Sequence, residues 1–309
     1  MFLGARRVKL GAKHSKSDSL AFWQQQTPAK PGLSDIESVR ARYEASFARF
    51  GAPAEFAVVP GSLGPVAGEW HKAGDDSRAL LYFHGGGFVA GSPESHRGLV
   101  AKLVEASGVA AFVPRYRLAP ENPYPAAVRD GLDAYRALIA RGVPAHSILL
   151  AGDEAGGGLA FAVALAARNA GLERPGGVAA LSPWADLALS GLSILGNRGS
   201  DGQLGWEQLF LCARHYLKKS NPCDVYASPA FASLKDFAPV MVHAGALEIL
   251  RDDASKLGDR AAEAGVSVSV EIYDGMGHIF QADPKLNEAK VSLARLGQFI
   301  RSRTAVLAS

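Results

Sequence analysis

Short apolar segments alternate with helix-like segments along most of this 309-residue chain. Runs such as Ala79–Phe83 and Val178–Leu181 are apolar at every position, which is typical of parallel strands buried on both faces of a sheet. Helix-like segments lie between them, such as Ala126–Ala140, which begins after a proline. The alternation predicts an α/β fold in which one mostly parallel sheet lies between layers of helices, in a single domain.

The same pattern places each expected element. Strands are expected over residues 55–59, 66–71, 79–83, 109–113, 148–151, 178–181, 240–244 and 266–273. Helices are expected over residues 35–50, 96–106, 126–140, 154–169, 206–217, 252–264 and 284–301. The segments 31–50 and 187–220 interrupt the alternation, and 187–205 is rich in Gly and Ser and reads as a loop. Both segments are expected to form a helical cap over the carboxyl edge of the sheet.

The net charge of +3 is unevenly distributed. Residues 1–30 hold six Lys or Arg and a single acid, so we expect a basic arm, poorly ordered or helical, before a near-neutral body at 31–309. Such a body does not indicate a nucleic-acid partner. The cysteines, Cys212 and Cys223, lack metal-ligand spacing, and no nucleotide-binding motif occurs, so neither a metal nor a cofactor is expected.

No apolar run is long enough to span a membrane. The N-terminal segment also lacks the apolar stretch of a secretory signal. These two observations predict a cytoplasmic protein without a membrane span.

Four features are expected to meet at the carboxyl ends of the strands, where open parallel sheets bind their ligands. The first is Gly85-Gly86-Gly87, which follows the strand 79–83. Three glycines leave their N–H groups unshielded, and such groups are suited to hold a developing oxyanion. A flexible turn is the alternative interpretation, but the place after a strand, next to His84, favours an oxyanion hole.

The second feature is the segment 151–157, between a buried strand and an Ala-rich helix. Small residues on both sides of Glu154 permit a sharp turn that holds this one side chain above the sheet. The N–H of Ala155 lies at the helix N-terminus and is expected to point to the same place.

The third and fourth features are a histidine and an acid. His278 follows the last strand and is the candidate general base. Glu248 follows the strand 240–244, and Asp252 and Asp253 are alternatives for the acid that orients the histidine. Position 154, the acid and the histidine come in the chain order of α/β-hydrolases.

With these residues the chain resembles the hormone-sensitive-lipase-like esterases, the bacterial family IV carboxylesterases, over about residues 35–303. The matching motifs are HGGGF at 84–88, YRLAPENPYPAA at 116–127, GDEAGG at 152–157, SPWADL at 182–187, EILRDD at 248–253 and GMGHIF at 275–280. The resemblance implies an α/β-hydrolase fold acting on a small ester or lactone without a cofactor.

The resemblance also assigns roles. It implies that Gly86, Gly87 and Ala155 are the oxyanion-hole donors, and that Glu248 orients His278. Members that act on monoterpene lactones are the most similar, because they too carry Glu at the acid position. Members of this family often pair through the last strand and helix, so a homodimer is one possible state.

Two aromatic residues are expected to line the substrate site. They are Phe88, next to the glycine triplet, and Trp184, in the segment 182–187.

One residue departs from the family pattern, because the nucleophile position holds Glu154 where the family has serine. The ordinary mechanism needs a hydroxyl that histidine deprotonates. No other serine of the chain has the same strand–turn–helix setting. Standard serine-esterase chemistry is therefore expected to be strongly reduced.

Three hypotheses follow from this departure. Glu154 could replace the nucleophile of an ordinary esterase and imitate a bound oxyanion or product acid. It could instead be a working nucleophile towards an alkyl carbon, or a general base. Finally, the protein could bind a small molecule without chemistry.

Overall fold

The computed structural model describes residues 6–8, 36–48, 57–72, 77–202 and 204–304. Its strands are β1 (Arg6–Val8), β2 (Val58–Leu63), β3 (Val66–His71), β4 (Ala79–Phe83), β5 (Ala111–Pro114), β6 (Ile148–Asp153), β7 (Gly177–Leu181), β8 (Val240–Gly245) and β9 (Val268–Tyr273). Its α-helices are α2 (Ile36–Ala48), α3 (Pro93–Ser107), α4 (Ala126–Ala140), α5 (Glu154–Asn169), α6 (Ser193–Gly196), α7 (Trp206–Leu217), α8 (Arg251–Glu263) and α9 (Asn287–Arg303).

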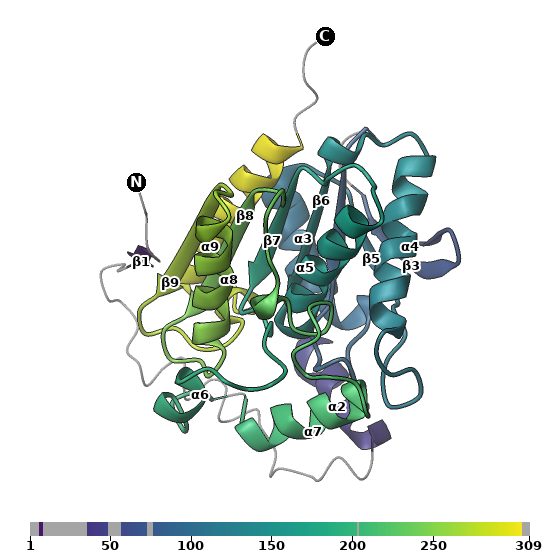
Figure 1. Cartoon of the computed structure of the whole chain (residues 1–309). Helices are drawn as coiled ribbons and strands as arrows, with labels where there is room; N and C mark the ends of the chain where they lie inside the picture. Colours follow the sequence, from purple (N-terminus) through teal and green to yellow (C-terminus); the bar gives the residue numbers. More distant parts are fainter. Residues whose placement is uncertain (1–5, 9–35, 49–56, 73–76, 203, 305–309) are drawn as a thin grey trace.

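The strands form one sheet in the order β1-β9-β8-β7-β6-β4-β5-β3-β2 (Figure 1). All neighbouring strands from β5 to β1 pair in parallel, whereas β3 and β2 are antiparallel additions at the other edge. The central strands β4, β6 and β7 are buried at every residue, as continuous apolar runs predict. The predicted mostly parallel α/β sheet is confirmed.

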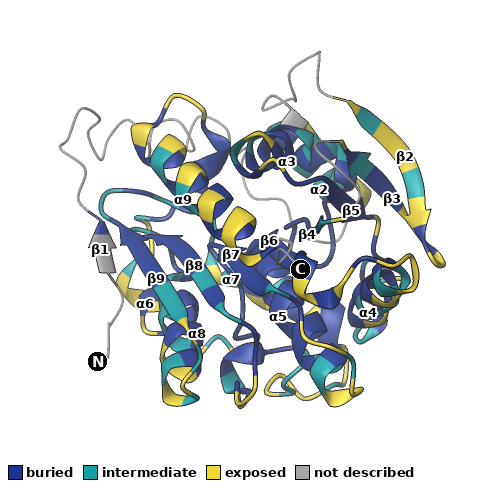
Figure 2. Cartoon of the chain, turned by 90° about the horizontal axis from the view of Figure 1, so that it is seen from above, coloured by how far each residue is buried: buried dark blue, intermediate teal, exposed yellow. Residues whose placement is uncertain are grey.

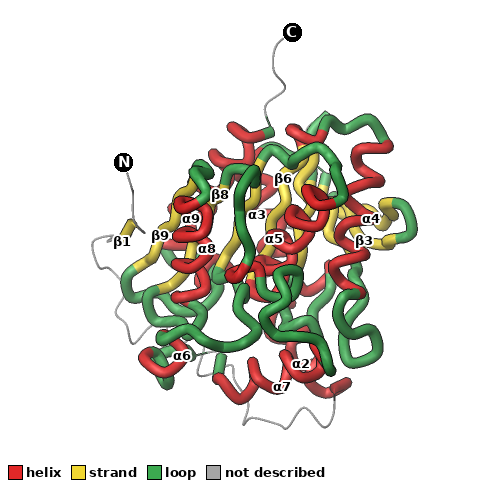
Figure 3. Tube along the Cα trace, viewed as in Figure 1, coloured by secondary structure: helices red, strands yellow, loops and turns green. Residues whose placement is uncertain are grey.

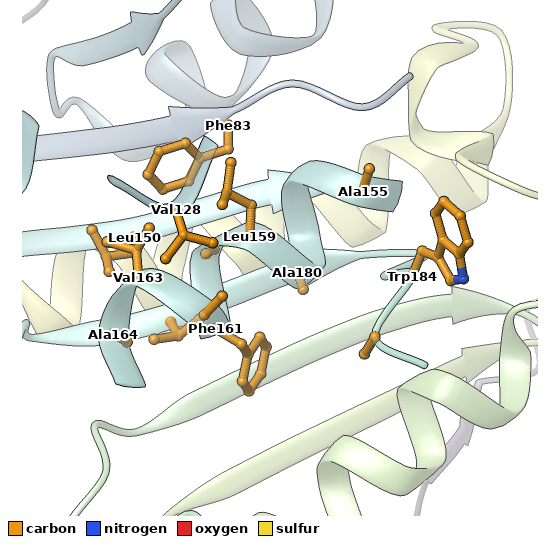
Figure 4. Close-up of a cluster of buried hydrophobic side chains, with 14 of the residues drawn as sticks. Phe83, Val128, Leu150, Ala155, Leu159, Phe161, Val163, Ala164, Ala180 and Trp184 are labelled. Carbon is orange, nitrogen blue, oxygen red and sulfur yellow. The ribbon is translucent and has the colours of Figure 1, made fainter. Parts of the chain in front are cut away.

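Helices cover both faces of the sheet (Figures 2 and 3). Helices α3 and α9 lie on one face, and α4, α5 and α8 lie on the other. Helix α5 is buried almost throughout, because it packs under the centre of the sheet. Figure 4 shows its apolar side chains Leu159, Phe161 and Val163 among residues of β4, β6 and α4. This packing holds the first residue of α5 at a defined point.

The cap lies at one end of the molecule, the lower end in Figure 1, where α2, α6 and α7 gather. Parts of the predicted cap segment 31–50, residues 31–35 and 49–50, are outside the described residues. The predicted loop at 187–205 contains the single-turn helix α6. No helix in the described part of the chain is long and apolar enough to cross a membrane.

Most element boundaries agree with the predictions within a few residues, and two differences have clear causes. Helix α3 begins at Pro93 because the side chain of Ser92 caps it by accepting the N–H of Ser95. The strand expected over 55–59 is shifted to β2, since Val58–Leu63 pairs residue by residue with β3 across a tight turn. Residues 55–56 lie outside the described part.

Within the segment predicted as a basic arm, Arg6–Val8 forms β1, which adds in parallel to the outer edge of β9. The side chain of Val8 is buried. The rest of residues 1–30 lies outside the described ranges. Because β1 occupies the edge of β9, pairing of two copies through that strand would have to displace it.

Candidate active site

The turn between β6 and α5 presents Glu154. Its backbone has φ of 49°, in the left-handed region that side chains other than glycine rarely adopt. A Cβ at Gly152 would overlap the carbonyl oxygen of Gly156, and one at Gly156 would overlap the carbonyl oxygen of Phe83. Glycine is therefore required at both positions for so close a turn, which has the geometry of a nucleophile elbow.

The Glu154 carboxylate accepts two hydrogen bonds from the glycine loop after β4. Its Oε2 lies 2.6 Å from the nitrogen of Gly86 and 2.8 Å from the nitrogen of Gly87. The Gly86 carbonyl in turn accepts the N–H groups of Val89 and Ala90, which fixes the orientation of the peptide that carries the Gly87 N–H. Two aligned donors thus converge on one oxygen, as in an oxyanion hole.

The structure corrects the prediction for Gly85. Its N–H donates to Oδ1 of Asp153 at 3.1 Å and lies 3.3 Å from Nε2 of His96, so it faces away from Glu154. Asp153 also accepts the hydroxyl hydrogen of Tyr82 at 2.7 Å. Burial alone would raise the pKa of Asp153, but the charge and hydrogen bond of the neighbouring His96, together with the hydrogen bond from Tyr82, outweigh burial and lower it. Gly85 and Asp153 therefore anchor the loop from behind.

Ala155 lies in the first turn of α5 and is completely buried. Figure 4 shows it at the end of α5 near Trp184. Its role as a third N–H donor stays a prediction.

His278 is held by Glu248, because its Nδ1 lies 2.7 Å from Oε2 of that carboxylate. The other oxygen of Glu248 accepts the N–H of Gly245 at 2.8 Å. Asp252 lies elsewhere: it pairs with Arg251 and accepts an N–H from α6. The structure thus brings Glu248 to the histidine, and the alternative acid Asp252 to the cap.

Asp253, the other rival acid, accepts the N–H groups of Ala185 and Asp186. It therefore holds the segment after β7 and is bound away from the Glu248–His278 pair.

The electrostatics of the pair favour a protonated imidazole. Burial alone lowers the pKa of His278, but the hydrogen bond and charge of Glu248 outweigh it, with further contributions from Asp201 and Glu154, so the pKa is raised. Burial also raises the pKa of Glu248. A carboxylate at position 154 therefore adds to the negative field around His278.

The cap fixes the loop that carries Glu248. Asn197 donates to the carbonyl oxygens of Ala246 (3.0 Å) and Glu248 (2.8 Å). Asp201 accepts the N–H of Ile249, and Ser193 donates to the carbonyl of the same residue. Sequence reasoning missed these contacts, because polar residues in a Gly/Ser-rich segment gave no sign of their partners.

A second part of the cap, α2, holds the glycine loop through Arg40. The Arg40 guanidinium donates to the carbonyl oxygens of Val89 (2.8 Å) and Ala119 (3.1 Å), and to both carboxylate oxygens of Glu121. The N–H of Ala119 donates to the carbonyl of Phe88. Helix α2 thus supports the segment that orients the oxyanion donors.

The aromatic residues predicted to line the site lie beside the elbow. Phe88 stacks on Tyr216 of α7 with ring centroids 3.9 Å apart. Trp184 is completely buried and its ring is 6.1 Å from that of Phe88. The backbone N–H of Trp184 donates to the Glu154 carbonyl. On α7, Sγ of Cys212 lies 2.8 Å from the place where a Cβ of Gly87 would be. Helix α7 therefore packs directly on the glycine loop.

Comparison with known proteins gives this geometry its context. Residues 80–282 match the family described by its alpha/beta hydrolase fold. The chain belongs to this family. Within it, the relatives and solved structures support a hormone-sensitive-lipase-like carboxylesterase.

Three similar proteins illustrate the relationship. An acetyl-hydrolase of Streptomyces hygroscopicus is 38% identical over 275 residues, which are 87% of this chain and 91% of the relative. An esterase of Acinetobacter venetianus is 35% identical over 79% of this chain and 82% of its own. The crystal structure of an esterase from the bacterial hormone-sensitive lipase family superposes with a TM-score of 0.89 at 34% identity, covering 94% of this chain and 98% of that one.

Proposed function

We propose that this chain is an ester-hydrolase scaffold whose oxyanion hole is filled by its own Glu154, so that serine-type ester hydrolysis is strongly reduced. The observation that carries the proposal is the position of Oε2, 2.6 Å and 2.8 Å from the nitrogens of Gly86 and Gly87. In an active esterase this position is occupied by the oxyanion of the tetrahedral intermediate or by an oxygen of the product acid.

The ordinary reaction fails at its first step. A hydroxyl at the elbow would give its proton to His278 and attack the ester carbonyl, and the N–H groups of the glycine loop would hold the oxyanion. A carboxylate has no hydroxyl proton to give, and here it also occupies the donors. Its attack on an ester would form an anhydride, which is energetically unfavourable.

The two other hypotheses have less support. A working nucleophile needs an oxygen that is free to approach a substrate carbon, whereas the Glu154 side chain is bound to two N–H groups and its residue is only 4% exposed. A silent binding protein does not need an oriented histidine, yet the Glu248–His278 contact at 2.7 Å is complete. The site retains the acid, the histidine and the glycine N–H donors of a hydrolase, and it lacks the nucleophile.

With a serine restored at position 154, we expect the substrates to be small esters or lactones with a short acyl group. The relative from Streptomyces hygroscopicus is named an acetyl-hydrolase. In this chain, Cys212 and Tyr216 of α7 pack on the glycine loop and restrict the space beside it. A cytoplasmic location and a homodimer stay predictions.

The test is Glu154→Ser, assayed with p-nitrophenyl acetate and butyrate. We expect the serine variant to hydrolyse both esters and the parent to be at least about 10³-fold slower in kcat/KM, the scale of losing a nucleophile. Glu154→Gln serves as the matched control, because it removes the charge without adding a hydroxyl, and it should stay inactive. A parent as fast as the serine variant would overturn the proposal.

A further inference from the structure

Large apolar side chains that are exposed in the described part of the chain gather on the cap. Leu192 and Leu195, at the helix α6, are 79% and 71% exposed, and Trp206 and Phe210 of α7 are 37% and 44% exposed. Val59 of β2 is the remaining exposed large apolar residue in that part. Single exposed apolar residues are common, but four in one segment indicate an interaction surface.

These residues lie on adjoining elements at the lower end of the molecule in Figure 1. An ion pair between Arg198, just after α6, and Glu207 of α7 joins the two elements at 3.1 Å. Along α7, Trp206, Phe210 and Arg214 are exposed at four-residue intervals and so share one face of the helix. The opposite face is buried against the glycine loop, which leaves the aromatic face directed outwards.

The charge around these residues is positive. The Arg214 guanidinium lies 5.9 Å from the centre of the Phe210 ring, and Lys218 is exposed nearby along the chain. Arg198 and Glu207 form an ion pair, so their charges cancel. Aliphatic and aromatic side chains with a basic border suit the boundary between the acyl chains and the anionic headgroups of a lipid surface.

We propose that this cap face, formed by Leu192, Leu195, Trp206, Phe210, Arg214 and Lys218, binds anionic lipid surfaces. Leucines that are more than two-thirds exposed enter the acyl boundary, and the basic residues pair with headgroup phosphates. A second copy of the chain is a poorer occupant, because an isologous contact would bring two basic borders together. The proposal is independent of the chemistry at Glu154.

The test uses the full chain and sedimentation with lipid vesicles. One set contains phosphatidylcholine alone, and the other contains about one-third phosphatidylglycerol. We expect the parent to bind the anionic vesicles and to be released by about 0.5 M NaCl, which screens surface charges. Leu192→Ser combined with Leu195→Ser should lower the vesicle partition coefficient at least about tenfold. Val59→Ser is the matched control and should bind like the parent.

Thermal denaturation of each variant checks that the fold is retained, which is expected because the replaced side chains are exposed. Three results would overturn the proposal. One is the absence of binding to the anionic vesicles. Another is vesicle binding by the leucine variant that equals binding by the parent. If the double variant Lys13→Gln, Lys16→Gln then no longer binds, the lipid-binding surface belongs to residues 1–30. The third is a dimer in solution that the leucine variant dissociates, with no binding to lipid.

Discussion

The contacts of Arg40 lead to a quantitative prediction about the oxyanion hole. In the variant Glu154→Ser the glutamate no longer ties the glycine loop to the elbow, so the loop depends more strongly on its support from α2. Replacing Arg40 by Ala in that variant removes the donors that hold the carbonyl oxygens of Val89 and Ala119. The peptide groups that orient the Gly87 N–H then lose one of their supports.

The magnitude follows from burial. The ion pair of Arg40 with Glu121 is exposed, with side chains 29% and 52% accessible, and contributes less than about 1 kcal/mol. The two bonds to carbonyl oxygens are partly buried and charged, worth about 1.5 kcal/mol each. Arg40→Ala should therefore lower the free energy of unfolding by about 3–4 kcal/mol, and Glu121→Gln by less than about 1 kcal/mol.

The effect on catalysis should exceed that on binding. Removing one oxyanion donor costs about 10²–10³ in kcat, so displacing the loop should lower kcat at least about tenfold with little change in KM. Steady-state hydrolysis of p-nitrophenyl acetate measures both constants, and Arg40→Lys, which keeps one charged donor nitrogen, should restore part of kcat. If Arg40→Ala destabilises the fold but leaves kcat within about twofold, Arg40 does not position the oxyanion hole.

Three further predictions concern the elbow, the histidine and a buried acid. Gly156→Ala should destabilise the fold by more than about 3 kcal/mol, because the added Cβ would overlap a carbonyl oxygen of β4. Gly196→Ala is the control and should cost less than about 1 kcal/mol, because, beyond its own helix, no atom lies within 4 Å of the place of its Cβ. Equal melting temperatures of the two variants would contradict this prediction. In the serine variant, kcat/KM should rise with pH as His278 loses its proton. Because Glu248 raises the pKa of His278, Glu248→Gln should move the midpoint of that rise to lower pH; an unmoved midpoint would show that Glu248 does not set it. Burial raises the pKa of Asp253 to about 8, so between pH 5 and pH 8 the folded state holds a proton that the unfolded state has released, and the free energy of unfolding should fall as the pH rises. Asp253→Asn should remove at least about 1 kcal/mol of that fall, measured by urea titration at each pH. An unchanged dependence of the free energy of unfolding on pH would refute this prediction.

The sequence predicted the fold and the main site residues because they leave local marks. Strands buried on both faces must be apolar throughout, and a sharp turn after such a strand needs Gly152 and Gly156. The same marks located Glu154, Glu248 and His278. The residues that support the site left no mark of this kind, because Arg40, Asn197 and Asp201 are ordinary polar residues whose partners lie far along the chain or in another loop.

By itself, the sequence determined that a carboxylate stands at the nucleophile position of an α/β-hydrolase, since residue order and turn chemistry are local properties. The tertiary structure decided where that carboxylate points and which glycines face it. Gly86 and Gly87 donate to Glu154, while Gly85, an identical residue beside them, turns its N–H towards Asp153. The direction of an N–H group depends on the backbone angles that distant contacts impose on the loop, and those contacts exist only once α2, α7 and the sheet are assembled.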